Sequence, residues 1–443
     1  MREKLAGHGL ATLFVLLAIA LLLAERAPPL LAVLTFVCAA VAARWSTVAV
    51  FLRANPVATF LALLLIWMLI SASWSVAGAE ALSGGVRIAL MIVVAAALPV
   101  LILSTPRTVR VRAAWWATFA LCLMGVLLLI ETLFDMPLLR AARYVFNDEA
   151  FVAVIPPVAE QQPGKVYFHL SALVNRLTHL SSVVAICALP LVAFLWARKA
   201  RGARSVAIAV AATSVLALAL SPAQAPLVAL AFGGMATAIL LVPAVASHRA
   251  LPGLSAAAVA VAVIAMPWFA QSAYERGVQS AETMDVSVIH RLAIWDNAAS
   301  LIAERPVAGY GIEASRVIGR SGLAVHDIMP GHEATTFQVL PLHPHNASIQ
   351  IWLELGGIGA LMFAAFAYFM TLKVWSYVHG SLHHAGIMGA NLVGAGLMGG
   401  WVTALVIAHL SYGIWQYWWI ATLGFVAAML AVMVAARDPD PRG

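Results

Sequence analysis

The sequence predicts an all-α polytopic membrane protein of about 12 transmembrane helices with a large, partly helical outer loop. Of its 443 residues, 63% are hydrophobic and 10% are charged, whereas a typical soluble domain carries about 25% charged residues. Its apolar runs are continuous over roughly 15–25 residues and do not alternate, which favours helices over strands. Because every backbone polar group must be paired within lipid, we expect a helical bundle.

The apolar segments divide the chain into three parts. The expected spans are residues 10–24, 30–43, 56–72, 86–104, 113–134, 171–196, 205–220, 225–247, 251–270, 347–371, 385–408 and 417–436. Residues 1–270 then hold nine spans and a first outer loop at 135–170, residues 271–346 form the large outer loop, and residues 347–443 hold three spans and a tail. The first run lacks a cleavage site typical of a signal peptide, so we interpret it as a membrane helix.

The basic residues predict the orientation of the bundle. With the N-terminus in the cytoplasm, the cluster Arg198, Lys199, Arg201 and Arg204 lies in a short inward-facing segment. Both termini are then expected in the cytoplasm, and the two long loops face outward. The formal net charge of +7 therefore reflects membrane topology, and we expect no nucleic-acid partner.

The large outer loop has its own helical pattern. Apolar residues recur at helical spacing over 288–304, which predicts an amphipathic helix that lies on the bilayer or caps the bundle. The pattern stops at Arg305-Pro306, and Gly309-Tyr310-Gly311 predicts a turn. A second short helical piece is expected at about 313–320.

Three arginines are expected at the outer ends of the helices. Arg87 begins the fourth span, Arg176 lies inside the sixth, and Arg291 lies on the loop helix. Arg87 is equally compatible with simple extension of its side chain to the membrane interface. Arg176 lies deeper and has no carboxylate at helical spacing, so we expect it to meet an anion. A guanidinium donates paired hydrogen bonds and stays charged, which suits pyrophosphate.

The turn before the tenth span combines polar residues with a helix start. His343, His345 and Asn346 surround Pro344, which we expect in the first turn of the helix. The alternative roles are a helix cap and a catalytic base, because the positive end of the helix dipole favours a neutral histidine. A zinc site is a weaker alternative, with His326, His332 and Glu333 as further ligands.

Deeper in the tenth span, the polar pattern continues. Asn346, Gln350 and Glu354 recur every four residues, which predicts a polar stripe that faces the protein interior. Gly356, Gly357 and Gly359 follow and are expected to allow close packing of helices. Gln350 and Glu354 either orient the histidine or are structural.

Two groups of residues resemble the signature of the O-antigen ligase and polymerase superfamily. The first is His345-Asn346 with Gln350, Glu354, Gly356 and Gly359; the second is Arg291 and Trp295 on a helix that ends at Pro306, before Gly309-Tyr310-Gly311. The resemblance covers about 288–360 in its motifs and the whole chain in its architecture, which is similar to GT-C glycosyltransferases.

The resemblance implies a glycosyltransferase of the bacterial inner membrane with a periplasmic active site. In an O-antigen ligase, a glycan passes with inversion from undecaprenyl pyrophosphate to a sugar hydroxyl of lipid A–core. His345 is the implied base, and Arg291 and Arg176 are the implied pyrophosphate ligands; Arg87 is added on physical grounds, and His343 supports the site. We expect a monomer with no metal ion or cofactor.

Other functions stay open. An O-antigen polymerase and a protein O-oligosaccharyltransferase belong to the same superfamily. The first outer loop holds only Arg140, Arg143 and Lys165, which favours a ligase modestly. A twelve-span transporter is the alternative from another class, but the polar residues lie at the outer rim and no internal repeat is seen.

Overall fold

The computed structural model describes residues 2–24, 26–53, 55–147, 150–152, 167–278, 286–319, 340–383 and 389–436. In chain order, the helices are α1 (Arg2–Leu23), α2 (Ala27–Ala42), α3 (Trp45–Leu52), α4 (Pro56–Ser71), α5 (Ala79–Leu103), α6 (Arg107–Leu133), α7 (Pro137–Asn147), α8 (Leu170–Trp196), α9 (Ala203–Leu220), α10 (Gln224–Leu240), α11 (Pro243–Ala246), α12 (Leu251–Val278), α13 (Val286–Glu304), α14 (Ala314–Ile318), α15 (Ala347–His383), α16 (Gly389–Leu410) and α17 (Tyr417–Ala435). Two short strands, β1 (Ala150–Val152) and β2 (Tyr167–His169), pair in parallel with Ala150 opposite Tyr167.

Each predicted span overlaps one of these helices; the first four residues of the eleventh span, 385–388, lie outside the described residues. Within the described ranges, 9 helices are long and apolar enough to cross a membrane, and α2 joins α3 at a bend of 113°. Helices α4 and α10 are apolar but shorter, at 16 and 17 residues. The predicted end of the eighth span at residue 247 is wrong, because α10 stops at Leu240 and Pro243 begins α11. The chain is a polytopic all-α membrane protein.

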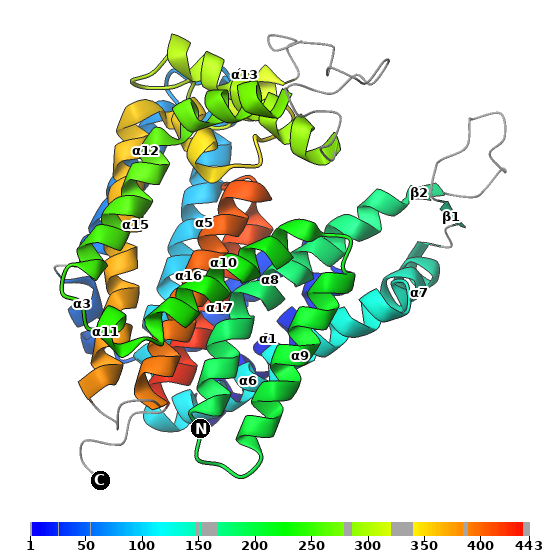
Figure 1. The fold of residues 1–443 in the computed structure, drawn as a ribbon, viewed down its shortest axis with the longest axis vertical. Helices are drawn as coiled ribbons and strands as arrows, with labels where there is room; N and C mark the ends of the chain where they lie inside the picture. The colour runs from blue at the N-terminus through cyan, green and yellow to red at the C-terminus, as the bar shows by residue number, and fades with distance from the viewer. Residues whose placement is uncertain are drawn as a thin grey trace.

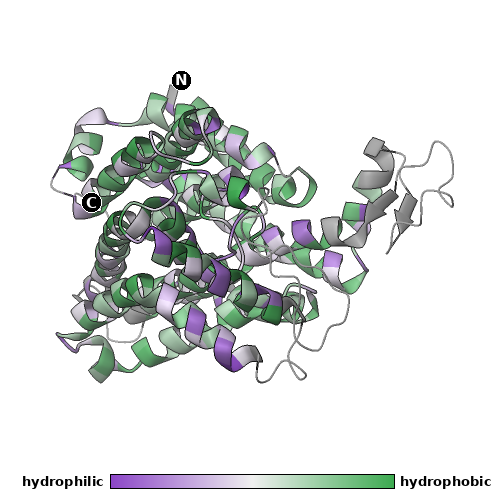
Figure 2. Cartoon of the chain, turned by 90° about the horizontal axis from the view of Figure 1, so that it is seen from above, coloured by the Kyte–Doolittle hydropathy of each residue, from purple (hydrophilic) through white to green (hydrophobic). Residues whose placement is uncertain are grey.

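The bundle has two neighbouring cores. One core joins α1, α2, α6, α8 and α17, and the other joins α4, α5, α12, α13 and α15. The loop between α16 and α17 belongs to both, because Tyr412 packs in the first core and Trp415 in the second. Apolar residues predominate along the helices of the bundle (Figure 2).

Glycines bring three of the membrane helices into backbone contact. A Cβ at Gly399 of α16 would lie 2.8 Å from the carbonyl oxygen of Gly233 on α10, and a Cβ at Gly400 would lie 2.8 Å from that of Ile186 on α8. Thr237 of α10 adds a hydrogen bond of 3.3 Å to the carbonyl of Ala395. Small residues allow this packing in lipid, where no hydrophobic force drives helices together.

The loop helices gather at one end of the bundle, which we name the α13 end. Helix α13 lies across this end (Figure 1) and packs on α12 and α15. The predicted amphipathic helix therefore caps the bundle, with Ile289, Ile294, Trp295 and Ile302 buried. Helix α14 matches the predicted second helical piece.

The first outer loop is anchored by a buried carboxylate. Glu131, near the end of α6, accepts hydrogen bonds from the backbone N–H groups of Leu138 at 2.7 Å and Leu139 at 3.2 Å. These N–H groups lie in the first turn of α7, where no intrahelical partner exists. Helix α7 and the two strands extend to one side of the bundle (Figure 1).

Candidate functional site

The polar residues predicted in the turn before α15 lie at the α13 end, against the loop between α16 and α17. His345 has a φ of 54°, in the left-handed region that residues other than glycine rarely adopt. Its Nδ1 lies 2.7 Å from the carbonyl oxygen of Ser411. A carbonyl can only accept, so the proton of the neutral ring lies on Nδ1 and the lone pair lies on Nε2.

The Nε2 atom of His345 makes no hydrogen bond within the described part of the chain. Burial lowers the pKa of His345; the hydrogen bond to Ser411 raises it in part, and the positive charges of Arg291 and His290 lower it further. The ring is therefore neutral near pH 7, with one nitrogen available as a base.

His343 differs from His345 because both of its ring nitrogens are engaged. The backbone N–H of His345 donates to His343 Nδ1 at 3.3 Å, so the proton of neutral His343 lies on Nε2. That atom lies 3.0 Å from Nε2 of Gln416, and an amide nitrogen cannot accept a proton. The Gln416 amide must therefore turn by 180° to present Oε1, which has no partner among the described residues, to this proton. Burial lowers the pKa of His343 to about 3, and the charges of His345 and Arg316 add to the effect.

Asn346 caps the start of α15. Its Oδ1 accepts from the backbone N–H of Ile349 at 3.1 Å, while its buried Nδ2 has no partner among the described residues. The helix begins at Ala347, so the prediction that Pro344 lies in its first turn is wrong. Pro344 instead lies in the preceding turn, where its carbonyl accepts from the indole N–H of Trp295 at 2.8 Å and ties the turn to α13.

The predicted polar stripe does face inward, and its lower members are fully bonded. Asn346, Gln350 and Glu354 are 0%, 4% and 1% exposed. The Glu354 carboxylate accepts four hydrogen bonds, from Ser315 Oγ at 2.5 Å, Glu313 N–H at 2.8 Å, Trp415 Nε1 at 3.0 Å and Gln350 Nε2 at 3.1 Å. The Oε1 of Gln350 accepts from the N–H of Ile414 at 2.9 Å. Together these bonds hold α14 and the loop between α16 and α17 against α15.

The glycines that follow the stripe do more than allow close packing, because α15 is broken at Gly356. Gly356 has a φ of 64° and a ψ of −167°, and a Cβ there would lie 2.3 Å from the carbonyl oxygen of Val307. The segment after α13 runs beside the break: the N–H groups of Tyr310 and Gly311 donate to the carbonyls of Leu353 and Glu354 at 2.9 and 2.8 Å. The sequence predicted the turn at 309–311 but not its insertion beside a broken helix.

The three predicted arginines lie in different surroundings. Arg291 is close enough to His345 to affect its pKa. Arg87 is exposed, donates to the carbonyl of Ser83 on its own helix at 3.1 Å and lies within electrostatic range of the Tyr417 hydroxyl. Arg176 donates to the carbonyl of Leu23, at the end of α1, at 3.1 Å and lies within electrostatic range of His179. The carbonyl end of α1 thus gives Arg176 a partner of negative partial charge.

Sequence reasoning missed two contributors to this site. Arg316 of α14 forms an ion pair of 2.7 Å with Glu313 and acts electrostatically on His343. The loop between α16 and α17 supplies the carbonyl of Ser411 and the amide of Gln416. The polar and aromatic run from Ser411 to Gln416, between two apolar helices, is a signal that could have indicated the loop.

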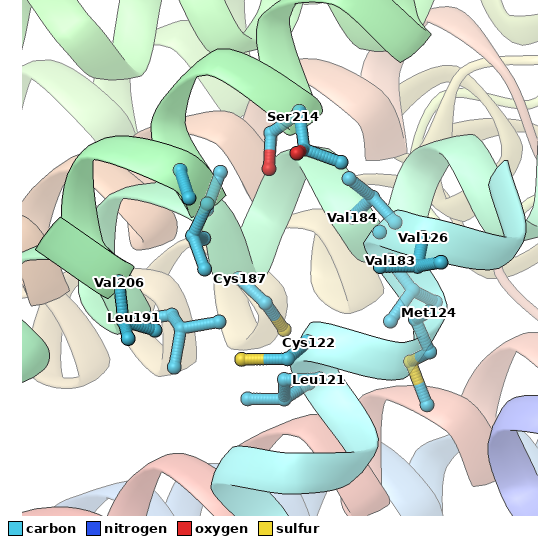
Figure 3. Close-up of a pocket in the computed structure, with 15 residues that line it drawn as sticks. Leu121, Cys122, Met124, Val126, Val183, Val184, Cys187, Leu191, Val206 and Ser214 are labelled. Atoms are coloured by element: carbon cyan, nitrogen blue, oxygen red, sulfur yellow. The ribbon is translucent and has the colours of Figure 1, made fainter. Parts of the chain in front are cut away.

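An apolar cavity lies apart from these residues. It is situated between α6, α8 and α9 (Figure 3), and Cys122, Met124, Cys187 and Ser214 are part of its lining. Cys187 is buried, Cys38 and Cys122 are half-buried, and all three thiols are free. None of the predicted site residues lines this cavity, so the polar site is separate from it.

In the described part of the chain, no three His, Cys, Asp or Glu side chains gather as a metal site requires. His326, His332 and Glu333, the further zinc ligands considered above, lie outside the described residues.

These features define a multi-pass helical membrane protein with a polar site at one end of its bundle. The family model of O-antigen ligase matches residues 209–364, from α9 through the break in α15. A Rickettsia conorii protein named "Putative polysaccharide ligase" is 30% identical over 148 residues, 33% of this chain and 32% of its own. Proteins of the same name from Rickettsia felis and Rickettsia bellii are 32% and 31% identical over 148 and 152 residues, 33% and 34% of each chain. The chain thus matches about a third of the length of these relatives. These similarities confirm the predicted resemblance to O-antigen ligases.

Proposed function

We propose that this protein is a polysaccharide ligase that transfers O-antigen from undecaprenyl pyrophosphate to a sugar hydroxyl of lipid A–core. The observation that carries the proposal is the arrangement of His345, whose Nδ1 is held by the Ser411 carbonyl while Nε2 has no partner in the described residues. This histidine lies in the segment that is similar to O-antigen ligases.

His345 has the properties that a general base needs. A base must be neutral and must present a lone pair in a fixed direction. Burial and the nearby Arg291 lower the pKa of His345 and so favour the neutral ring. The engaged nitrogens of His343 favour His345 as the base and leave His343 to hold the backbone of His345.

Arginines are proposed to hold the leaving group. Pyrophosphate gains negative charge in the transition state, so a fixed guanidinium stabilises it more at that point than in the ground state. Arg291 is the first candidate, because it acts electrostatically on His345. Arg176 is a second candidate at the end of α1.

In the proposed reaction, His345 Nε2 takes the proton of the acceptor hydroxyl. The hydroxyl oxygen forms a bond to the anomeric carbon of the donor glycan from the face opposite the pyrophosphate. The bond from that carbon to the pyrophosphate oxygen breaks, and the electron pair leaves with undecaprenyl pyrophosphate. The configuration at the anomeric carbon inverts, and the chemistry needs no metal ion.

Gln350 and Glu354 are proposed to support the base indirectly. Gln350 accepts from Ile414 N–H, and Glu354 accepts from Trp415 Nε1, so both hold the loop whose Ser411 carbonyl orients His345. The proposal also requires the α13 end to face the periplasm and the lipid tail of the donor to lie between helices in the outer leaflet of the inner membrane.

The proposal is tested with His345→Gln in a host strain that lacks its own O-antigen ligase. General-base catalysis contributes roughly 10²–10⁴-fold, so we expect the lipopolysaccharide ladder to disappear while folded protein is retained. His248→Gln is the matched control, because His248 is exposed and makes only a local hydrogen bond to Ala250 N–H. Monodisperse elution after detergent extraction checks the fold.

Three results would contradict parts of the proposed function. A normal ladder in His345→Gln contradicts the assignment of the base. If the wild-type protein lengthens lipid-linked glycan but leaves lipid A–core unmodified, the protein is a polymerase. If the purified wild-type protein transfers nothing to lipid A–core, the ligase proposal is wrong.

A further inference from the structure

A second group of cations lies near the histidines, on elements other than α13. Arg316 contacts Glu313 through its Nε at 2.7 Å, and its side chain is 44% exposed. Its two terminal nitrogens make no hydrogen bond within the described part of the chain. Arg316 and His343 line the same crevice, together with Gly413 and Gln416.

Helix α5 adds a second guanidinium to this group. The Tyr417 hydroxyl lies within electrostatic range of Arg87, Glu313 and Arg316. Gly84, one turn before Arg87, packs against the same place, because a Cβ there would lie 3.1 Å from Glu313 Cγ. Arg87 on α5 and Arg316 on α14 therefore both lie within electrostatic range of the Tyr417 hydroxyl at the start of α17, where α5 packs against Glu313.

The two cation groups act on different histidines. Arg291 and His290 of α13 affect His345, whereas Arg316 affects His343. The imidazole rings of His343 and His345 are only 4.3 Å apart. A transfer enzyme must hold a donor and an acceptor beside its base. If the α13 cations bind the pyrophosphate of the donor, the second cation group is left for the acceptor.

We propose that Arg316 and Arg87, with the Tyr417 hydroxyl, bind a phosphate group on the acceptor. This proposal rests on the proposed function, in which Arg291 serves the donor. Two guanidiniums from different helices suit the several terminal oxygens of a phosphate better than a carboxylate, which a single guanidinium satisfies. The acceptor is therefore a phosphorylated saccharide, whose phosphate lies at α14 while its reacting hydroxyl meets His345.

Glu313 controls how strongly Arg316 attracts an anion. Its backbone N–H is fixed by Glu354, and its carboxylate occupies the Nε side of Arg316. In this ion pair the Arg316 side chain is 44% exposed and the Glu313 side chain 15% exposed, so solvent screens the pair from the arginine side and its contribution to stability is small. Removal of the Glu313 charge should therefore leave the fold intact and strengthen phosphate binding, whereas removal of the Arg316 charge should weaken it.

The experiment measures transfer by the purified full-length protein with a saturating undecaprenyl-pyrophosphate glycan. The acceptor is lipid A–core, used as isolated and after phosphatase treatment. We expect Arg316→Gln to raise the KM for phosphorylated acceptor about 10- to 100-fold, the range of a charge-assisted hydrogen bond, with the KM for the donor unchanged. Phosphatase treatment should have the same effect on the wild-type protein and no further effect on Arg316→Gln.

Two further variants make the test specific. Glu313→Gln should lower the KM for phosphorylated acceptor, opposite in sign to Arg316→Gln. Arg305→Gln is the matched control, because Arg305 is exposed on the same side of the protein and stacks on Tyr310, 4.6 Å from its ring centre. Its KM values should equal those of the wild-type protein.

The outcomes separate this proposal from the proposed function. If Glu313→Gln and Arg316→Gln change the KM in the same direction, the ion pair is structural and the phosphate subsite is wrong. An unchanged KM for acceptor in Arg316→Gln, or an altered KM for donor alone, also overturns it. Wild-type protein that transfers glycan to neither form of lipid A–core contradicts the ligase function itself.

Discussion

The turn before α15 and the break inside α15 lie on the same helix but differ in how fully their polar groups are bonded. At the break, Glu354 accepts four hydrogen bonds, and the carbonyls of Leu353, Glu354 and Leu355 all have partners outside the helix. In the turn, His345 Nε2 and Asn346 Nδ2 have none among the described residues.

This difference separates support from chemistry. A buried group with every bond made cannot take a new partner without losing an old one, so it rigidifies the structure. A positioned group with unused capacity can bind or react. We therefore propose that Glu354 supports the architecture and that His345 takes part in the reaction, although both are polar residues of one motif.

The comparison is tested most strongly by Glu354→Gln. In either orientation the N–H₂ group of the amide faces a buried donor: Trp415 Nε1 and Glu313 N–H on one side, or Gln350 Nε2 on the other. Unpaired buried groups and the loss of charged hydrogen bonds cost about 1–3 kcal/mol each, so we expect a loss of at least about 3 kcal/mol in the free energy of unfolding. Thermal unfolding in detergent, followed by tryptophan fluorescence, measures this loss.

The matched control is Glu275→Gln, because Glu275 is exposed on α12. If Glu354→Gln unfolds at the wild-type temperature but has lost transfer activity, the division between support and chemistry is wrong. Glu354 would then belong to the reaction.

The sequence allowed most of the fold to be predicted, because membrane helices are long apolar runs. The span positions followed from the length of the apolar runs, and the amphipathic helix followed from its periodicity. The break at Gly356 did not, because glycines in a membrane helix usually mark close packing and nothing local distinguishes the two cases. The segment Pro306–Gly311 and Trp67 of α4, both distant in the sequence, give the break its hydrogen bonds.

Only the part of the site that depends on residue types and helical spacing could be predicted from the sequence. The inward stripe of Asn346, Gln350 and Glu354 depends on helical spacing, which the sequence contains. The role of Ser411 depends on a backbone carbonyl, which no residue type announces. Arg316 was missed because an arginine on a short helix of the outer loop resembles any surface charge until its position near His343 is known.

A second prediction concerns Arg176, which has a structural bond and a proposed role in pyrophosphate binding. Arg176→Gln removes the charge and weakens its contact with the Leu23 carbonyl. A hydrogen bond to a helix end contributes about 1 kcal/mol, so we expect a small loss of stability. If Arg176 also holds pyrophosphate, kcat should fall at least about tenfold.

Single-turnover kinetics with the purified variant, beside its thermal unfolding, separate the two effects. Normal kcat with a lowered unfolding temperature would make Arg176 purely structural, like Glu354. A matched variant is Arg140→Gln, because Arg140 lies outside the α13 end and pairs with Asp135.

The smallest expected effect is on the pH dependence, and it tests the environment of His345 directly. The base must be neutral, so kcat/KM should hold above its pKa and fall as the pH drops through it. Burial and Arg291 lower that pKa below the ordinary value of about 6.5, which puts the acid limb of the wild-type profile below 6.5. Arg291→Gln removes one positive neighbour and should raise the pKa.

The acid limb of Arg291→Gln should therefore move to higher pH, because one positive charge that disfavours protonation of His345 is removed. The shape of the profile reports this shift even when the variant is slow, and Arg305→Gln should leave the limb in place. A limb that stays fixed in Arg291→Gln, or moves to lower pH, would show that Arg291 does not act on the base. Arg291 would then serve the fold of α13, and the distinction between the turn and the break would rest on His345 alone.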